Sequence, residues 1–356
     1  MEAATSRPET GRRMSALVWN GDRLEEQGMP EPEIKNPHEV KVSIKLSGIC
    51  GTDLAVVAGK EPGEAGIIRG HEAVGIVSEV GEAVRSLAPG DRVVVDPNQS
   101  CGLCRFCRSG KVHLCIGEDK AGMPIAGLNR HGTFAPSFVT EERFLHRLKP
   151  EVSWEAAVLT EPLACVLHHF REAGIGEGES VLILGSGPMG LLCQFAARRL
   201  GCFTVSTELR QGRLAAARRY SDCALTPEEL TAERVRELLG DRGFDTVIDT
   251  VGTQMATAER WVDRGGTIVP MAINGAYRYP LSPTMYAQQA IRLIGAGEYL
   301  NTFGEALRLV EEAPELAGLV NRRCALGEAP AAIAELLDGT ASPDGTEAIK
   351  TVFAFS

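Results

Sequence analysis

The sequence predicts an α/β protein of two domains, one rich in β-strands and one built on a doubly wound parallel sheet. Its 356 residues are enough for two cores, and 44% apolar with 24% charged residues is usual for a globular protein. Roughly the first 150 residues form short strand-like runs separated by Gly, Pro and Asn. After Gly178, apolar strands alternate with longer helical patterns, which is typical of βαβ units and a parallel sheet.

The expected elements follow the apolar periodicity along the chain. In the first half we expect strands at residues 14–19, 39–46, 73–80, 91–95 and 143–148. A helical pattern then begins behind Ser153, a suitable N-cap residue. In the second half we expect strands at 181–184, 203–207, 246–248 and 267–271, and helices at 189–200, 210–220 and 302–312.

Domain boundaries follow from this change in pattern. We predict a β-rich domain at 1–155, with a loose polar extension at 1–13, and a nucleotide-binding domain at 156–294. Residues 295–356 should return to the first domain, because the last strand, at 349–355, is not needed by the parallel sheet.

Charge and hydropathy exclude several classes of function. The formal net charge is −10 at pH 7, whereas a nucleic-acid partner requires a basic face. The N-terminal MEAATSRPETGRRM has no apolar run behind its charges, so we expect no signal peptide. No window of about 18 apolar residues is present to span a membrane. We therefore expect a cytoplasmic protein in a reducing compartment, with neither nucleic acid nor membrane as a partner.

Four of the ten cysteines lie in the short segment CGLCRFCRSGKVHLC, as Cys101, Cys104, Cys107 and Cys115. In a reducing compartment such a cluster indicates a metal site rather than disulfides. The spacing begins like an iron–sulfur run, but that run closes after three residues and a proline follows it. Four thiols on one short loop suit a closed, structural zinc site, with an iron–sulfur cluster or chance as the alternatives. Four other cysteines fall in apolar segments and are expected in the core: Cys193, Cys202, Cys223 and Cys324.

The segment VLILGSGPMGLL has the pattern of a dinucleotide-binding turn between a strand and a helix. Gly185 makes the tight turn, Gly187 lets backbone approach a pyrophosphate, and Gly190 allows close packing of helix on strand. Pro188 and Met189 complete the loop at the helix N-terminus, where free N–H groups favour phosphate.

Glu208 follows the next expected strand, at the place where a carboxylate would bind the adenosine ribose hydroxyls. A carboxylate there repels a 2′-phosphate, so the sequence favours NAD over NADP. Arg210 and Arg213 lie just behind it and temper that preference. The alternative is that Glu208 is only a solvated charge at a strand end.

Other metal-binding residue types occur in three separate places. Cys50 lies in GICGTDL, His71 and Glu72 lie in RGHEAVG, and Glu161 lies in LTEPLAC. Taken one at a time, each is more simply a core or solvated residue.

Taken together, these segments resemble one family. GHEAVGIVSEVGEAVRSLAPGDRV, from Gly70 to Val93, is similar to the zinc signature of medium-chain alcohol dehydrogenases. CGTD precedes it, the four-cysteine segment follows it, and GSGPMG with Glu208 completes the order. The chain looks most like the polyol branch (sorbitol, threonine and glucose dehydrogenases), because Glu161-Pro162-Leu163 stands where the alcohol branch has a third cysteine ligand.

This resemblance implies a GroES-like catalytic domain, a Rossmann domain, two zinc ions per subunit and NAD as the cofactor. It also implies that Cys50 and His71 bind the catalytic zinc directly, and that Glu72 and Glu161 bind it directly or through water. Zinc would lower the pKa of a bound alcohol, and a hydride would then pass to the nicotinamide. Thr52 is placed to take the hydroxyl proton. A homodimer or homotetramer is expected.

Two residues depart from the family pattern. Ala55 stands where many relatives have a histidine at the outer end of the proton relay, so the proton must leave through water or another group. Cys165 lies one helical turn after Glu161 and is therefore a rival ligand.

The expected function is interconversion of a secondary alcohol and a ketone on a polyol, sugar or (amino)cyclitol. Two alternatives stay open: a zinc-independent reductase of activated double bonds, and a zinc-binding protein of the same fold without turnover. The intact ligand set weighs against both. Arg130 and His131, in the loop after the cysteine segment, could contact substrate but are more simply solvated loop residues.

Overall fold

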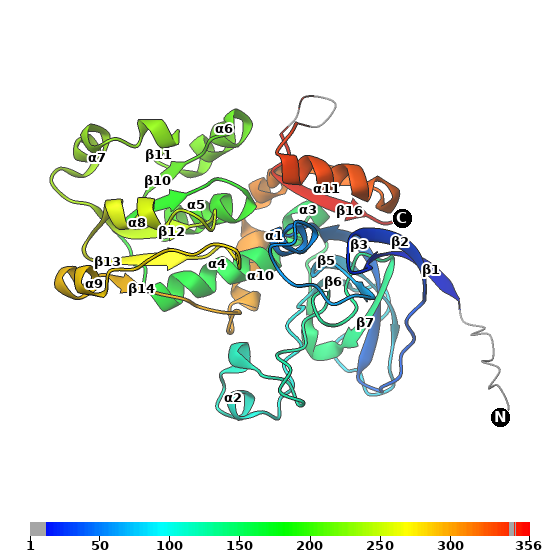
Figure 1. The fold of residues 1–356 in the computed structure, drawn as a ribbon. Coiled ribbons are helices and arrows are strands. Elements are labelled where there is room, and N and C mark those ends of the chain that lie inside the picture. Colours follow the sequence, from blue (N-terminus) through cyan, green and yellow to red (C-terminus); the bar gives the residue numbers. More distant parts are fainter. Residues whose placement is uncertain (1–11, 342–344, 346) are drawn as a thin grey trace, which may run out of the picture.

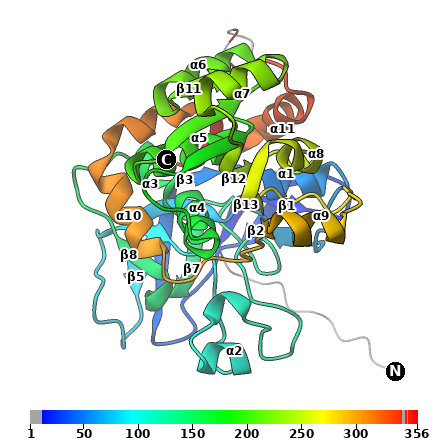
Figure 2. The same ribbon diagram turned by 90° about the vertical axis from the view of Figure 1, so that its left-hand side faces the viewer.

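The computed structural model describes residues 12–341, 345 and 347–356, and it has the α/β architecture that the sequence predicts (Figure 1). A β-rich domain lies beside a parallel sheet flanked by helices, and the segment carrying α2 (Arg105–Arg108) projects from the body in both views (Figures 1 and 2). Most of the expected extension at 1–13 lies outside the described residues, and Arg13 already belongs to the first strand.

The β-rich domain contains two sheets. A three-stranded sheet has the order β2 (Leu24–Pro30), β1 (Arg13–Trp19) and β4 (Ile67–Ile68). The larger sheet contains β15 (Val320–Cys324), β16 (Lys350–Ala354), β3 (Glu39–Gly48), β5 (Glu72–Val80), β6 (Arg92–Val95) and β8 (Leu145–Arg147), with β7 (Ser137–Glu141) also on β3. Buried and more exposed residues alternate along β3, as in a strand with one face on the core. Its antiparallel register sets Gly48 opposite Glu72, which brings two of the predicted site segments together.

The second domain is a six-stranded sheet in which all neighbouring strands are parallel. Its order is β11 (Cys223–Leu225), β10 (Phe203–Thr207), β9 (Ser180–Leu184), β12 (Phe244–Asp249), β13 (Val262–Pro270) and β14 (Arg292–Leu293). From β9 the chain adds β10 and β11 on one side of the sheet and then β12, β13 and β14 on the other. The point between β9 and β12, where the strand order reverses, is where such sheets bind nucleotides.

Helices cover both faces of this sheet because its strands are apolar on both sides. On β9, Val181 and Ile183 pack in a cluster with α4 (Thr160–Ala173) and α5 (Pro188–Arg199). Leu182 and Leu184 pack in a second cluster with the helices of the other face. The remaining helices are α1 (Gly51–Val57), α3 (Trp154–Ala157), α6 (Gln211–Tyr220), α7 (Ala232–Leu239), α8 (Met255–Trp261), α9 (Pro283–Gln289), α10 (Phe303–Glu312) and α11 (Ala329–Asp338).

The two domains share one apolar cluster. It contains Leu46 and Val74 from the β-rich domain together with the α4 and β9 residues of the other. The side chain of Ser153 accepts a hydrogen bond from Ala156 N at 3.2 Å, as expected of an N-cap. The last strand, β16, pairs with β3 and β15, on the side of the first domain. The domain boundaries stay a prediction.

Several elements differ from the sequence-based expectation. Strands β2 and β7 and helix α1 were not expected, because each is short and lacks a clear apolar period. The strand expected at 143–148 is shorter, since Glu142–Phe144 forms a 3-10 turn before β8. Within the described residues, no helix is long and apolar enough to cross a bilayer.

A buried ion pair joins α1 to the turn before β5. Arg69 Nε and Nη2 both lie 3.1 Å from Asp53 Oδ1, and neither side chain is more than 2% exposed. Asp53 Oδ2 also accepts a hydrogen bond from Cys50 N at 3.1 Å. The pair therefore holds the segments of Cys50 and His71 in one position.

Arg69→Met should lower the free energy of unfolding by about 3–5 kcal/mol, because it leaves the Asp53 charge buried without a partner. Arg23→Met is the matched control, since Arg23 and Glu25 form an exposed pair and its loss should cost under about 1 kcal/mol. Urea unfolding followed by circular dichroism measures both. Equal, small losses would mean that the Asp53 carboxylate reaches water.

Candidate active site and metal centres

Three of the predicted ligands meet at one point. Cys50 is the N-cap residue of α1, two residues after the end of β3, and His71 immediately precedes Glu72, the first residue of β5. A ligand atom of each, taken as Sγ, a ring nitrogen and a carboxylate oxygen, lies within 4.8 Å of the other two. The turn into β5 depends on Gly70, which has φ +92° and lies against the Phe134 ring, where a β-carbon would collide.

The donor set fits a cation. Burial, and next the charge of Glu72, raise the pKa of the Cys50 thiol to about 12, so a thiolate here requires a positive ion. His71 Nδ1 is buried and has no hydrogen-bond partner among the described residues. Sulfur, imidazole nitrogen and carboxylate oxygen are the ligands of catalytic zinc sites that keep an open position.

Lys350 contacts Glu72, one of these three residues, and was not predicted from the sequence. It is 2% exposed, forms an ion pair with Glu72, and donates from Nζ to Ile49 O at 2.9 Å. The signal was present, because a lysine inside the apolar strand IKTVF is expensive to bury without a partner.

Glu161 and Thr52 lie beside the three ligands but outside the group. Glu161 is near the start of α4 and 7% exposed, and burial raises its pKa well above the usual value. Cys165, one turn later, directs its thiol toward Glu161 Oε1 at 3.7 Å, so the rival ligand is a neighbour of Glu161. Thr52 Oγ1 lies 3.4 Å from His71 Nε2.

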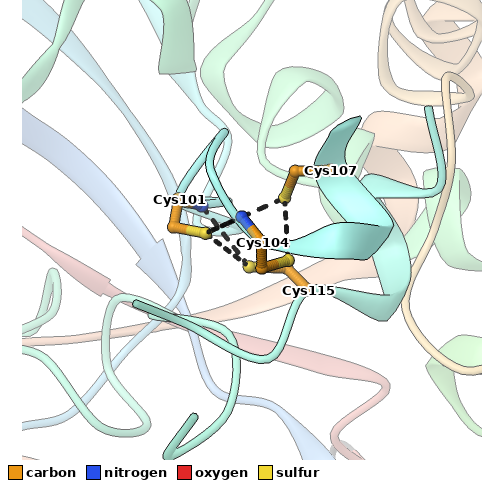
Figure 3. Close-up of side chains that lie close together, drawn as sticks. All are labelled: Cys101, Cys104, Cys107 and Cys115. Carbon is orange, nitrogen blue, oxygen red and sulfur yellow. Dashed lines mark hydrogen bonds between the residues drawn. The ribbon is translucent and has the colours of Figure 1, made fainter. Parts of the chain in front are cut away.

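The four clustered cysteines form a second, separate group (Figure 3). Sγ–Sγ distances are 3.5 Å for Cys104–Cys107 and Cys101–Cys115, and 4.0 Å for Cys101–Cys107. Corners of a tetrahedron with ligand bonds of about 2.3 Å lie roughly 3.8 Å apart, so the arrangement fits one closed zinc site. All ten cysteines lie in the described part of the chain and are free thiols.

Backbone N–H groups prepare this cluster for negative charge. Cys101 Sγ accepts from Cys104 N at 3.4 Å, and Cys115 Sγ accepts from Gly117 N at 3.3 Å. Hydrogen bonds from the N–H groups of Cys107 and Ile116 lower the pKa of Cys104 to about 6. Burial instead raises the pKa of Cys107 to about 12, so full ionisation of the cluster requires a bound cation.

The glycine-rich loop has the geometry of a phosphate-binding turn. Gly185 has φ +95°, Gly187 is the N-cap residue of α5, and Pro188 is the first helical residue. Gly190 packs against the Gly185 carbonyl, which leaves no space for a β-carbon. Each glycine thus meets the requirement that the sequence pattern implies.

Glu208 is buried directly after β10 and accepts hydrogen bonds both from the glycine-rich loop after β9 and from the two residues that follow it. Its Oε2 accepts from Ser186 N, and its Oε1 accepts from Leu209 N and Arg210 N, each at 2.9 Å. This is the position from which a carboxylate can reach a ribose.

The first turn of α6 meets the C-terminal segment of the chain. Glu347 Oε2 accepts from Gly212 N at 2.7 Å and from Arg213 N at 3.3 Å. Arg213 Nη2 donates to Ala348 O at 3.0 Å. Sequence reasoning missed Glu347, because nothing local in the sequence indicates where it docks.

A cavity of about 440 Å³ joins the candidate ligands to the segments that follow β9 and β12, which contain Met189 and Thr250 (the nucleotide loops). The β-rich domain contributes Cys50, Thr52, His71 and Glu72 to its lining, and the second domain contributes Glu161, Met189 and Thr250. Other lining residues that the sequence analysis missed include Asn98, Ile125, Leu128 and Glu298. Arg130 and His131 do not line it, and both are exposed.

Comparison with known proteins agrees with this geometry. The alcohol dehydrogenase GroES-like domain matches residues 36–150, and the zinc-binding dehydrogenase domain matches residues 188–312. D-xylulose reductase A of Aspergillus niger is 34% identical over 272 residues, which are 72% of this chain and 74% of that protein. D-xylulose reductase A of Aspergillus oryzae is 31% identical over 279 residues, which are 74% and 76% of the two chains.

Solved structures with the same fold include a zinc-binding dehydrogenase from Sinorhizobium meliloti 1021 bound to NADP. It is 27% identical with a TM-score of 0.85, and the match covers 97% of this chain and 100% of that one. An alcohol dehydrogenase from Thermus sp. ATN1 is 26% identical with a TM-score of 0.84, and the match covers 96% and 100% of the two chains.

Proposed function

The chain belongs to the zinc-dependent medium-chain alcohol dehydrogenase family, in its polyol branch, and from this membership we propose a specific activity. The proposed enzyme uses zinc and NAD to interconvert a secondary alcohol and a ketone on a polyol, sugar or (amino)cyclitol. The observation that carries the proposal is the shared cavity. It is lined by Cys50, His71 and Glu72 on one side, and by Met189 and Thr250 of the nucleotide-binding domain on the other.

The chain's residues have separate roles in this proposal. Cys50, His71 and either Glu72 or Glu161 hold a zinc ion, which supplies Lewis-acid chemistry to a substrate hydroxyl. The loop of Gly185 and Glu208 would hold NAD, a cofactor that supplies a hydride acceptor. Thr52, beside His71, accepts the hydroxyl proton. Ala55 also lines the cavity, so the proton leaves through water or another group rather than through a histidine at residue 55.

Two features disfavour the alternative functions. A reductase of activated double bonds needs no metal ligands, yet this chain brings Cys50, His71 and Glu72 within 4.8 Å of one another. A protein without turnover needs no open cavity between the ligands and the nucleotide loops. A screen of secondary alcohols with NAD, followed by the absorbance of reduced nicotinamide, tests the proposal. Failure of every alcohol with zinc-loaded protein would contradict it.

The purified chain should contain two zinc ions per subunit. Cys107→Ser should remove one of them and lower the thermal midpoint, because structural zinc binding is coupled to folding. Cys50→Ser should remove the other, leave the midpoint near the wild-type value and abolish turnover. Elemental analysis and thermal unfolding measure these effects.

Cys223→Ser is the control, since Cys223 lies outside both groups of ligands. If Cys107→Ser left stability unchanged while Cys50→Ser unfolded the protein, the two sites would be assigned the wrong way round. A single zinc per chain in the wild type would favour the alternative functions.

The choice of NAD over NADP rests on two carboxylates at the first turn of α6. Helix N-termini attract anions, and a 2′-phosphate on the ribose held by Glu208 would need the N–H groups of this turn. Glu208 already accepts from the N–H groups of Leu209 and Arg210, and Glu347 accepts from those of Gly212 and Arg213. Two negative charges thus oppose the phosphate, and the Arg213 side chain is engaged with Ala348 O.

Wild-type kcat/KM should favour NAD over NADP by about tenfold or more, since placing like charges together costs several kcal/mol. Glu208→Ala should lower that ratio by roughly tenfold, and Glu208→Ala with Glu347→Gln should lower it further. Cofactor dissociation constants should change in the same order. The Sinorhizobium meliloti structure is bound to NADP, so both cofactors should be tested. A similar kcat/KM for NAD and NADP in the wild type would contradict a role of these carboxylates in cofactor choice.

Thr52→Ala should lower kcat by roughly 10²–10⁴-fold, the usual effect of losing a positioned proton-transfer group. Thr52→Ser, which keeps the hydroxyl, should retain most of the rate. Ala55→His should change the pH–rate profile near pH 6–7, where an imidazole titrates at about 6.5. Nearly full activity of Thr52→Ala at every pH would make the hydroxyl a structural part of the turn after Cys50.

A further inference from the structure

Glu298 is a cavity carboxylate that the proposed chemistry does not use. It lies between β14 and α10, lines the cavity beside Glu161 and the zinc ligands, and is half-buried. Its Oε2 accepts a hydrogen bond of 3.4 Å from Asn98 Nδ2. That amide donor is neutral, so it does not balance the charge.

The protein holds Glu298 in place from both sides. Asp96 Oδ1 accepts from Tyr299 OH at 2.6 Å and from Asn98 N at 3.0 Å. Tyr299 is 5% exposed, so the residue next to Glu298 is fixed in the core. The carboxylate is therefore preorganised toward the cavity, as binding groups are when neighbouring hydrogen bonds support them.

The other acidic groups of the cavity have a counter-charge, which is observed for Glu72 and proposed for Glu161 and Cys50. Glu72 is paired with Lys350. Glu161 and Cys50 face the proposed zinc ion. Within the described residues, Glu298 has no ion pair, and Lys60, the remaining cation of the lining, is exposed to water. Apolar side chains such as Ile125 and Leu128 share the lining, and a carboxylate near them gains from a cation.

We propose that Glu298 is a subsite for an ammonium group, so that the substrate is an amino alcohol whose hydroxyl reacts and whose amine pairs with this carboxylate. The proposal rests on the proposed dehydrogenase function and narrows its substrate class. A protonated amine would form a charge-assisted hydrogen bond with the free oxygen of Glu298 and would neutralise its negative charge. Aliphatic amines titrate near 10, as the lysine side chain does, so the substrate is a cation at neutral pH.

The test compares aminocyclohexanols with the matching cyclohexanediols, which keep the reacting hydroxyl and lack the charge. Zinc-loaded wild type with NAD should show kcat/KM at least about tenfold higher for the amino alcohols. Glu298→Gln keeps the shape and the hydrogen-bonding oxygen but removes the charge. It should raise KM for the amino alcohols by roughly 10- to 100-fold and leave KM for the diols unchanged.

Glu172→Gln is the matched control, because Glu172 is exposed on α4 and does not line the cavity, and it should change neither KM. If Glu298→Gln raised KM equally for both substrates, or for neither, Glu298 would have only a structural role. That result would overturn the ammonium subsite and leave the proposed dehydrogenase function intact.

If the wild type oxidised no alcohol of either kind, the proposed function would be wrong. The ammonium subsite would then be tested separately, by measuring the affinity for the amino alcohol. Calorimetry of aminocyclohexanol with the zinc-loaded protein and reduced NAD should still show roughly tenfold or more weaker binding for Glu298→Gln. Equal binding by wild type and variant would overturn the subsite.

Discussion

One buried ammonium group ties together the parts of the candidate active site. Lys350 comes from the last strand, yet its Nζ bonds the carbonyl of Ile49, the residue before Cys50, and pairs with Glu72, the residue after His71. A lone lysine in this position would be costly, and so would a lone glutamate, but each offsets part of the desolvation cost of the other. The pair leaves so little room that residue 48 must be glycine, because a β-carbon there would collide with both side chains. The return of the C-terminal segment to the first domain is therefore a requirement of the site.

The reacting end of the cavity exists only when the two domains lie side by side. Cys50, His71 and Glu72 belong to one domain, whereas Glu161 of α4, Met189 and Thr250 belong to the other. Hydrogen bonds between the two domains lie at both ends of the region that contains the cavity and the nucleotide loops. At the cavity end, Glu61 accepts a hydrogen bond of 2.5 Å from Gly275 N, and at the ribose end Glu347 accepts from the first turn of α6. These contacts add to the apolar cluster that the two domains share.

Local patterns predicted what local chemistry determines. Cys101 to Cys115 and the Gly185 loop were found from spacing alone, since a metal cage and a phosphate turn need given residue types at given intervals. The fold class followed from the change of apolar period. Lys350, Glu298 and Glu347 were not found, because each acts on a segment more than a hundred residues away. Sequence spacing holds no record of such tertiary contacts, and only the strand pairing and the domain packing bring them together.

The cysteine lobe, residues 101–115, is separate from the catalytic ligands, yet both of its stems form the cavity wall. Asn98 leads into the lobe and Ile125 leads out of it, and the two form a β-bridge while both line the cavity. Gln99 N and Ala126 N extend this pairing through hydrogen bonds of 2.9 and 3.0 Å across the stems. A closed cage at the end of the lobe removes conformational freedom from the loop between the stems, and so stabilises their pairing. Because Asn98 also bonds Glu298, a metal ion held by the four cysteines would help to set the position of the proposed ammonium subsite. Through this contact, a metal site that touches no reactant would influence which substrate the proposed subsite binds.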